Sequence, residues 1–426
     1  MGLAKDRSGN FAMMSALLLL PLAGALGLGI DVSHAVSVKH ELQAAADAAA
    51  LAALASGSAG VKAAMQQGDG EVEAAETESL SAFDRNAGAK SYKITRHVEV
   101  TKDKGILTAK VTFQAHVPTS FSRVLGQKTM DVGGSAIAKF STGIYRDFYL
   151  LLDNSPSMGL GATYDDIATM KANTDDSCAF ACHIVKNGVE QPTDTYKKAR
   201  ALGVTTRIDV VASATASLMD TASRERLVSN QFRMAVYSFG KSAETRGLTE
   251  IVGLTNDLDQ IKTKAGKVDL MSIPSSNYDK DQMTDYDGTI AALQTQMGNA
   301  GTGMTSSEPE KVLFLVTDGV NDANKPTDCS QAVWRSTRCQ EPIDIRICDS
   351  LKDKGLRIAV LYTTYLPLPG DDWYKKWISP FAGQIAPALK ACASPNFFFE
   401  VNPSEGIPDA MKALFMKVIN APRLVS

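Results

Sequence analysis

The sequence predicts an α/β protein in which a single N-terminal transmembrane helix and a small α+β segment precede a doubly wound α/β domain. Three observations support this prediction. The chain starts with an uncharged apolar run, its middle alternates apolar and polar residues with a period of two, and its remainder alternates strand-like and helix-like segments. The length of 426 residues allows two or three domains at roughly 150 residues each.

Composition excludes several classes of protein. With 44% hydrophobic and 21% charged residues the chain is globular and not disordered. The 44 Lys+Arg residues nearly balance the 47 Asp+Glu residues, so no overall positive field would recruit nucleic acid. The six cysteines are too few for a disulfide scaffold, but their even number fits a few bridges in an oxidising compartment.

Residues 11–30 form the predicted membrane anchor, because they are uncharged and as a helix would extend about 30 Å, the thickness of a bilayer core. The basic residues Lys5 and Arg7 place residues 1–10 in the cytoplasm as a short tip, with the rest of the chain outside. A cleaved secretory signal is the competing interpretation. The apolar run is longer than the usual ~7–15 residues of such a signal, which favours a permanent anchor.

Residues 31–60 continue as an Ala-rich helical extension. Because Ala side chains are small, this helix needs a close packing partner to be more than marginally stable. Two interpretations remain open. The extension is either a spacer that lifts the soluble part off the membrane, or a surface for self-association with similar helices.

This N-terminal stretch resembles the TadE/TadG-like region of Flp (tight adherence) pilus-assembly proteins. The matching features are the motif from Arg7 to Ala12, an apolar span that ends before Asp31, and the Ala-rich run 43–51. The resemblance implies a single-pass protein of the bacterial inner membrane whose C-terminal part is periplasmic. Pilin-like members that are processed carry Glu five residues after the cleavage-site Gly. Here that position is Met14, so we expect no processing.

Residues 61–142 are predicted to form a small α+β segment of pilin-like architecture. Residues 61–90 are polar and are expected to finish the helix or to form a surface loop. Strand-like alternation over residues 92–100 and 106–113 flanks a turn at 102–105 and predicts a hairpin. Residues 132–140 form a weaker third strand candidate.

Residues 144–424 are predicted to form the doubly wound domain. The runs FYLLLD and VLFLVTD are almost continuously apolar, which is typical of central parallel strands buried on both faces. Helical patterns separate most of the strands. Strands are expected at 148–153, 232–239, 250–254, 312–318, 356–362 and 397–401, and helices at about 195–222, 257–265, 286–297, 343–354, 374–391 and 405–419.

Polar residues follow the ends of these strands, where doubly wound folds bind ligands. Asp153, Ser155 and Ser157 follow the first strand, Asp318 follows the fourth, and Thr284 precedes a helix. Carboxylates and hydroxyls form an all-oxygen site suited to a hard divalent cation, Mg²⁺ or Ca²⁺. Because the hydroxyls are neutral, the cation would retain the capacity to bind an external carboxylate.

The order of these motifs resembles the von Willebrand factor A domain and its metal-ion-dependent adhesion site. The resemblance implies that Ser155, Ser157 and Thr284 bind the metal directly, and that Asp153 and Asp318 act mainly through water. Thr289 is the alternative to Thr284, which we favour because it lies six residues before Ile290, an apolar helix position of the family.

Residues 159–204 are an insertion after the metal loop and, by position, are expected on the ligand face. The insertion contains Cys178 and Cys182, for which a small disulfide loop or a longer-range pairing is expected. Cys329 with Cys339 and Cys348 with Cys392 are two further plausible pairs, although sequence alone does not fix connectivity.

Together these features predict a membrane-anchored periplasmic binding module for pilus assembly or anchoring, which captures an acidic residue of a protein partner through its metal site. The alternative is a structural or force-sensing envelope protein with a vestigial site. Enzymatic function is disfavoured, because no positioned base accompanies Ser155 or Ser157 and no Gly-rich phosphate loop is present.

Overall fold

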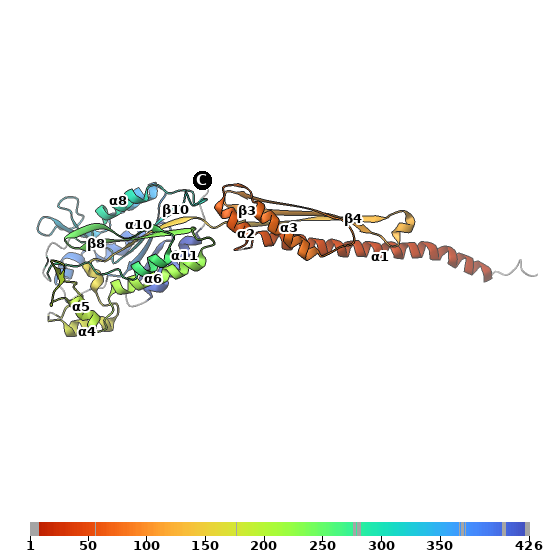
Figure 1. The fold of residues 1–426 in the computed structure, drawn as a ribbon. Coiled ribbons are helices and arrows are strands. Elements are labelled where there is room, and N and C mark those ends of the chain that lie inside the picture. Colours follow the sequence, from red (N-terminus) through yellow and green to blue (C-terminus); the bar gives the residue numbers. More distant parts are fainter. Residues whose placement is uncertain are drawn as a thin grey trace, which may run out of the picture. The chain divides into compact units, whose positions relative to one another are not determined.

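The computed structural model describes residues 8–421, apart from 56, 176, 276–277, 279–282, 366, 368–369, 371 and 403–405. Residues 1–7 of the expected cytoplasmic tip therefore lie outside the described residues, as do residues 422–424 at the end of the expected domain. The chain folds into two compact units, Met1–Gly143 and Ile144–Ser426 (Figure 1).

The first unit is built on helix α1, Ser8–Ala53, which is 46 residues long and includes Pro21. Its N-terminal half exposes large apolar side chains, among them Leu18, Leu22 and Leu26. Within the described part of the chain, α1 is the helix long and apolar enough to cross a membrane. Exposed leucines are costly in water and favourable in lipid, so this half of α1 has the surface of a membrane helix.

One face of the C-terminal half of α1 is buried within the unit. Leu42, Ala46 and Ala49 are fully shielded where α1 packs on helix α3, Glu73–Ala87, and on the sheet. The hydroxyl of Ser79 in α3 donates to the carbonyl of Ala49 over 3.0 Å, a close approach that small side chains permit. The Ala-rich face therefore packs inside the chain, and self-association through this helix stays a prediction.

The expectation of a helix end or surface loop over residues 61–90 was wrong. This stretch forms helix α2, Ala59–Gln66, the short strand β1, Gly70–Glu71, and helix α3. Ala75, Ala82 and Phe83 of α3 are buried and lie on one helical face. The many Glu residues of this stretch occupy the other faces and conceal that apolar stripe in the sequence.

The sheet of the first unit is antiparallel and has the order β1-β2-β3-β4. Strands β2, Ile94–Asp103, and β3, Ile106–Pro118, form the predicted hairpin, and β4, Thr129–Ser141, is the predicted third strand. Lys104 and Gly105 both have positive φ, which a two-residue turn with the twist of the strands requires. Alternate residues of β3, such as Val111 and Phe113, are buried against the helices.

The second unit is a doubly wound sheet of the order β14-β13-β10-β5-β8-β9, in which only the edge strand β9 is antiparallel. All seven residues of the central strand β5 are buried, as its apolar run predicted. The strands are β5, Arg146–Leu152; β8, Phe232–Ser242; β9, Thr245–Thr255; β10, Glu310–Thr317; β13, Arg357–Thr363; and β14, Phe398–Val401.

Helices cover both faces of this sheet. One core lies beneath α6, α7 and α11, and the other beneath α8, α9 and α10. The alternation of strands and helices is thus as predicted. The helices are α6, Arg207–Glu225; α7, Leu258–Ala265; α8, Tyr286–Met297; α9, Ile345–Asp353; α10, Ala382–Cys392; and α11, Ile407–Ile419.

Three details differ from the expected elements. The helix expected over 195–222 is divided into α5, Thr195–Ala201, and α6, because Thr206 and Asp209 form a capping box that starts a new helix. The helix expected over 374–391 begins as a π-helical turn, Tyr374–Ile378, before α10. A hairpin that the sequence pattern did not reveal follows β10.

Candidate metal centre

The predicted site lies at the carboxyl edge of the second sheet. Strands β5 and β10 are parallel neighbours, so the loops that follow Leu152 and Thr317 emerge side by side. Asp153, Ser155 and Ser157 lie in the first loop and Asp318 begins the second. The structure therefore brings these four predicted residues to one place.

The carboxylate of Asp153 is fully buried and organises the first loop. Its Oδ1 accepts hydrogen bonds from the Ser155 amide at 3.0 Å and the Ser155 hydroxyl at 2.6 Å. Its Oδ2 accepts from the Thr317 hydroxyl at 2.6 Å, which links the ends of β5 and β10. Burial raises the pKa of Asp153, because the charged form loses its hydration. The hydrogen bonds partly offset this cost.

The hydroxyl oxygens of Ser155 and Ser157 are 2.9 Å apart. Neighbouring ligands of an octahedral Mg²⁺ at about 2.1 Å from the metal are about 3 Å from each other. The turn Pro156–Gly159 holds the two hydroxyls in this arrangement. The spacing therefore suits two adjacent ligands of a magnesium ion.

Asp318 is the least satisfied carboxylate in the site. It is 1% exposed, and neither of its oxygens has a hydrogen-bond partner among the described residues. Burial and the charge of Asp153 raise its pKa to about 7, and Arg207 and the Ser157 hydroxyl oppose this rise only partly. A buried acceptor without a donor is costly, so these oxygens fit a cation site.

Thr284 and Thr289 occupy different environments. Thr284 lies just before the N-cap of α8 and exchanges two backbone hydrogen bonds of 3.0 Å with Asp322, four residues beyond Asp318. Thr289 lies inside α8, is 1% exposed and has a hydroxyl without a partner in the described residues. Thr284 therefore lies in a loop that is tied to the segment after β10, and its role as a metal ligand stays a prediction.

Sequence reasoning missed Arg207, the first residue of α6. Its guanidinium Nη1 lies 3.8 Å from Asp318 Oδ2, and both side chains are 1% exposed. Burial lowers the pKa of Arg207, and the Asp318 charge opposes this. An Arg at the start of an amphipathic helix is usually exposed, so no sequence signal pointed to this buried pair.

Tyr286 and Thr317 complete the hydrogen-bond chain behind Asp153. The Tyr286 hydroxyl bonds to the Thr317 hydroxyl, which in turn donates to Asp153. The Tyr286 amide donates to the side chain of Asn321 at 3.1 Å, and so attaches the start of α8 to the segment after Asp318. Thr317 belongs to the apolar run that leads to Asp318, whereas no sequence pattern singled out Tyr286.

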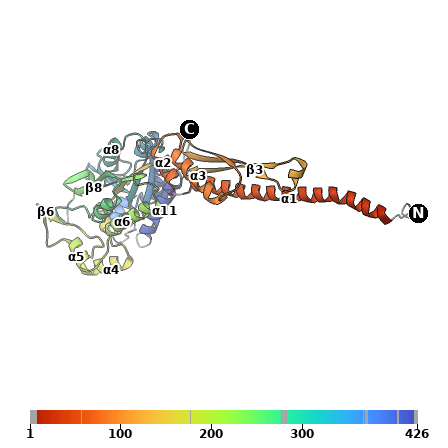
Figure 2. The ribbon, with the colours of Figure 1, turned by 45° about the vertical axis from the view of Figure 1, so that its right-hand side comes forward.

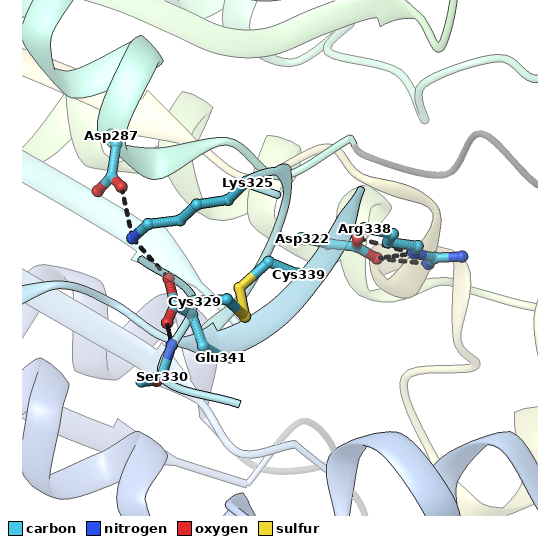
Figure 3. The surroundings of a disulfide bond; sticks show 8 residues. All are labelled: Asp287, Asp322, Lys325, Cys329, Ser330, Arg338, Cys339 and Glu341. Carbon is cyan, nitrogen blue, oxygen red and sulfur yellow. Dashed lines mark hydrogen bonds and ion pairs between the residues drawn. A yellow bond between two sulfur atoms is a disulfide. The ribbon is translucent and has the colours of Figure 1, made fainter. Parts of the chain in front are cut away.

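The unexpected hairpin, β11, Val320–Asn324, with β12, Arg338–Pro342, starts two residues beyond Asp318. Figure 3 shows how it is braced: Arg338 binds Asp322, Lys325 bridges Asp287 and Glu341, and a disulfide joins Cys329 to Cys339. Because β11 also carries Asp322, the partner of Thr284, this bracing holds the third loop of the site.

The two further disulfide pairs that the sequence made plausible are confirmed. Cys329 pairs with Cys339, and Cys348 of α9 pairs with Cys392 of α10. The other two cysteines, Cys178 and Cys182, lie at half-buried positions in the insertion.

The insertion contains a second group with metal-ligand chemistry, formed by His183, Glu190 and Asp194. Asp194 is already engaged, because it pairs with His183 at 2.9 Å and accepts from the amides of Ile184 at 2.8 Å and Lys197 at 2.7 Å. It thereby caps α5. This group is explained by its structural role.

The His183–Asp194 pair predicts a pH optimum for the stability of the insertion. The hydrogen bond that the His183 ring donates to Asp194 raises the pKa of His183, so the contribution of this bond to stability is complete below about pH 6.5 and is lost as the pH rises through the raised value. Burial raises the pKa of Asp194, but hydrogen bonds from His183 and the backbone lower it below the ordinary value. Its contribution is therefore lost only in acid, below about pH 4.

We expect amide exchange in residues 180–197, corrected for intrinsic rates, to be slowest at about pH 5 and faster at about pH 8. His183→Gln is the control, since it keeps the size of the side chain and removes the titration. An identical pH profile in both proteins would contradict the prediction.

The N-terminal part of the chain matches a known family. Residues 9–64 match the model of the Flp pilus-assembly TadE/G-like family. This is a TadE/G-like region. It comprises α1 from its second residue and most of α2, so the exposed apolar helix and its Ala-rich continuation are the TadE/G-like part of the protein. None of the curated proteins matches the sequence.

Several solved structures are similar to the chain at low identity. The von Willebrand factor domain of the type V pili tip protein Mfa5 from Porphyromonas gingivalis is 12% identical, with 66% of this chain and 99% of that chain covered and a TM-score of 0.36. The PilB minor pilin from Streptococcus sanguinis is 10% identical, with coverages of 78% and 79% and a TM-score of 0.33.

Proximal thread matrix protein 1 from the mussel byssus, with a zinc-occupied metal-ion-dependent adhesion site, is 14% identical, with coverages of 65% and 46% and a TM-score of 0.35. At these scores the fold assignment rests on the strand order of the chain itself. That order confirms the predicted doubly wound α/β domain, which follows the TadE/G-like N-terminal helix in the chain.

Proposed function

We propose that this protein is a membrane-anchored binding module of the Flp (tight adherence) pilus machinery. In this proposal Asp153, Ser155, Ser157, Thr284 and Asp318 hold a divalent cation, Mg²⁺ or Ca²⁺, and the cation captures an acidic residue of a protein partner. The TadE/G-like region supports the pilus assignment. The proposal includes no catalytic role.

The observation that carries the metal site is the buried carboxylate of Asp318, which accepts no hydrogen bond from the described residues, beside a second buried carboxylate. Two such groups at close range repel each other, and Arg207 alone at 3.8 Å does not balance them. A divalent cation between the loops would supply the missing charge. The hydroxyls of Ser155 and Ser157 offer it further oxygen ligands without adding negative charge.

The charge balance also explains why the partner would be acidic. Two carboxylates, one guanidinium and one divalent cation leave the site with a net positive charge. Such a site, partly shielded from water, attracts an anion strongly. A carboxylate of the partner is an oxygen ligand that a hard cation accepts in place of water.

Anchoring by residues 11–30 would place the second unit in the periplasm. The basic residues before the apolar run favour a cytoplasmic N-terminus. The two disulfides of the second unit support an oxidising compartment, where such bonds persist.

Arg207 also motivates a second candidate function. Since this guanidinium already lies beside Asp318, it can substitute in part for a metal. The protein would then be a structural or force-sensing envelope component with a vestigial site.

Cation binding to the full-length protein in nanodiscs separates these functions. We expect wild type to bind Mg²⁺ or Ca²⁺ by isothermal titration, and the Ser155→Ala/Ser157→Ala variant to lose about 100-fold or more in affinity. Pull-down of pilus proteins should require the cation, be abolished by EDTA and be restored by adding Mg²⁺.

A substitution of Thr289 is the matched control for a substitution of Thr284 in the cation-binding experiment. Thr284→Ala should weaken cation binding, whereas Thr289→Val should leave it unchanged because Thr289 lies within α8 and not in the loop before it. Absence of cation binding by well-folded wild type would favour the vestigial site.

A further inference from the structure

The loop between β3 and β4 carries exposed apolar side chains at one end of the first sheet. It spans residues 119–128 and contains the 3₁₀ turn Ser122–Leu125. Phe121 is 50% exposed and Val124 is 89% exposed. Exposing such side chains to water at a loop tip is unfavourable and marks an interaction surface.

This loop, the β3–β4 tip, contacts α1 at Gly27 and Asp31. The carboxylate of Asp31 accepts hydrogen bonds from three successive amides, those of Ser120 at 2.8 Å, Phe121 at 3.0 Å and Ser122 at 2.6 Å. Phe121 also packs on Gly27, where an added Cβ would lie 2.5 Å from the Phe121 Cβ. The absent side chain of Gly27 is what lets the tip contact the helix.

The part of α1 that contacts the tip is the C-terminal end of its apolar run, residues 11–30. Gly27 lies three residues before Ile30, the last residue of the run, which corresponds to about 5 Å along the helix. Leu26, Leu28 and Ile30 are exposed at the same level. In both views α1 continues well beyond this end of the sheet (Figures 1 and 2). A bilayer around residues 11–30 would therefore reach the tip.

The remaining chemistry of the tip suits a lipid headgroup region. Arg123 and Lys128 are exposed, and residues 119–128 contain no acidic residue. Basic side chains bind lipid phosphates, and aromatic side chains prefer the boundary between headgroups and hydrocarbon. The tip thus presents Phe121 and Val124 for the hydrocarbon and cations for the phosphates.

We propose that the β3–β4 tip is a second membrane-contacting element, which inserts Phe121 and Val124 into the outer leaflet of the bilayer that α1 crosses. The proposal rests on the proposed anchoring by residues 11–30. Lipid contact at both α1 and the tip fixes the tilt and rotation of the first unit relative to the membrane plane. Asp31 couples the two elements at the membrane surface.

Depth-dependent quenching in proteoliposomes tests this insertion. The full-length protein is reconstituted in phosphatidylethanolamine and phosphatidylglycerol vesicles that carry lipids brominated either near the carbonyl or near the methyl end of the acyl chains. Single Trp substitutions add one fluorophore to the three native Trp, which all lie beyond residue 330 and supply a constant background. The Trp of Leu22→Trp reports lipid contact of the anchor, and the Trp of Phe121→Trp reports lipid contact of the tip.

In Phe121→Trp, lipids brominated near the carbonyl should quench most of the added Trp fluorescence. Lipids brominated near the methyl end should quench little of it. Val124→Trp should behave likewise, and it serves if position 121 does not tolerate the change, because Val124 is almost fully exposed. Ile106→Trp is the matched control, since Ile106 is 48% exposed on the same sheet at the β2–β3 turn. It should not be quenched.

The outcomes distinguish the tip from the anchor. Quenching of Leu22→Trp without quenching of either tip variant overturns the tip contact and leaves the anchor intact. Absence of quenching at all positions, including Leu22→Trp, overturns both the tip contact and the proposed anchoring by residues 11–30. Tip emission that changes with protein density and not with bromine position identifies a second copy as the occupant and also overturns the proposal.

Discussion

Asp318→Ala is expected to destabilise the second unit by about 3–5 kcal/mol, since it removes the nearest charge partner of the buried Arg207 guanidinium. The two side chains are each 1% exposed, so water does not replace the lost carboxylate. Urea unfolding followed by Trp fluorescence measures the effect selectively, because all three Trp residues belong to the second unit.

A double-mutant cycle identifies the cause. Arg207→Met should recover most of the stability lost in Asp318→Ala, because an apolar side chain of similar length needs no charge partner. If Asp318→Ala unfolds like wild type, the guanidinium is not desolvated and the buried pair is refuted. The cycle also explains why the serine substitutions are a cleaner test of metal binding than removal of Asp318.

Removal of the Cys348–Cys392 disulfide is expected to lower the free energy of unfolding of the second unit by about 4 kcal/mol. The bond closes a loop of 44 residues between α9 and α10, and closing a loop of that length restricts the unfolded chain by about this amount. Both sulfurs lie in the buried core beside the sheet. Thermal or urea unfolding of Cys348→Ala/Cys392→Ala measures the loss.

Cys329→Ala/Cys339→Ala is the matched comparison. Its loop of 10 residues predicts a smaller loss of about 3 kcal/mol, mainly in the β11–β12 hairpin beside the loops of the candidate metal site. We therefore expect this variant to weaken cation binding more than the Cys348 and Cys392 variant does. Equal stability losses in the two variants would argue against the loop-length explanation.

The main features of the site were predictable because they follow from local pattern. Asp153, Ser155 and Asp318 directly follow apolar runs that read as central strands, and parallel strands end at one edge. The sequence pattern therefore implies that these side chains lie close together. The same reasoning gave the order of most strands and helices in the second unit.

Other features escaped prediction because they depend on residues distant in the sequence. The apolar stripe of α3 is difficult to recognise in the sequence because Glu residues surround it. It is buried because α3 packs on α1. Arg207 is 111 positions before Asp318, and nothing near it indicates burial. The β11–β12 hairpin has short, mixed strands that its pairing and its disulfide stabilise.

The amino-acid sequence by itself determined the apolar N-terminal helix, the alternation of strands and helices, and the carboxylates and hydroxyls at the strand ends, since each follows from local periodicity and composition. Only the tertiary structure decided which charges are buried and which side chains remain unsatisfied. The buried oxygens of Asp318 accept no hydrogen bond from the described residues, and Asp31 accepts a hydrogen bond from the amide of Ser120, 89 residues away in the chain. Desolvation is a property of the packed molecule, because it depends on everything that surrounds a group and not on its neighbours in the chain.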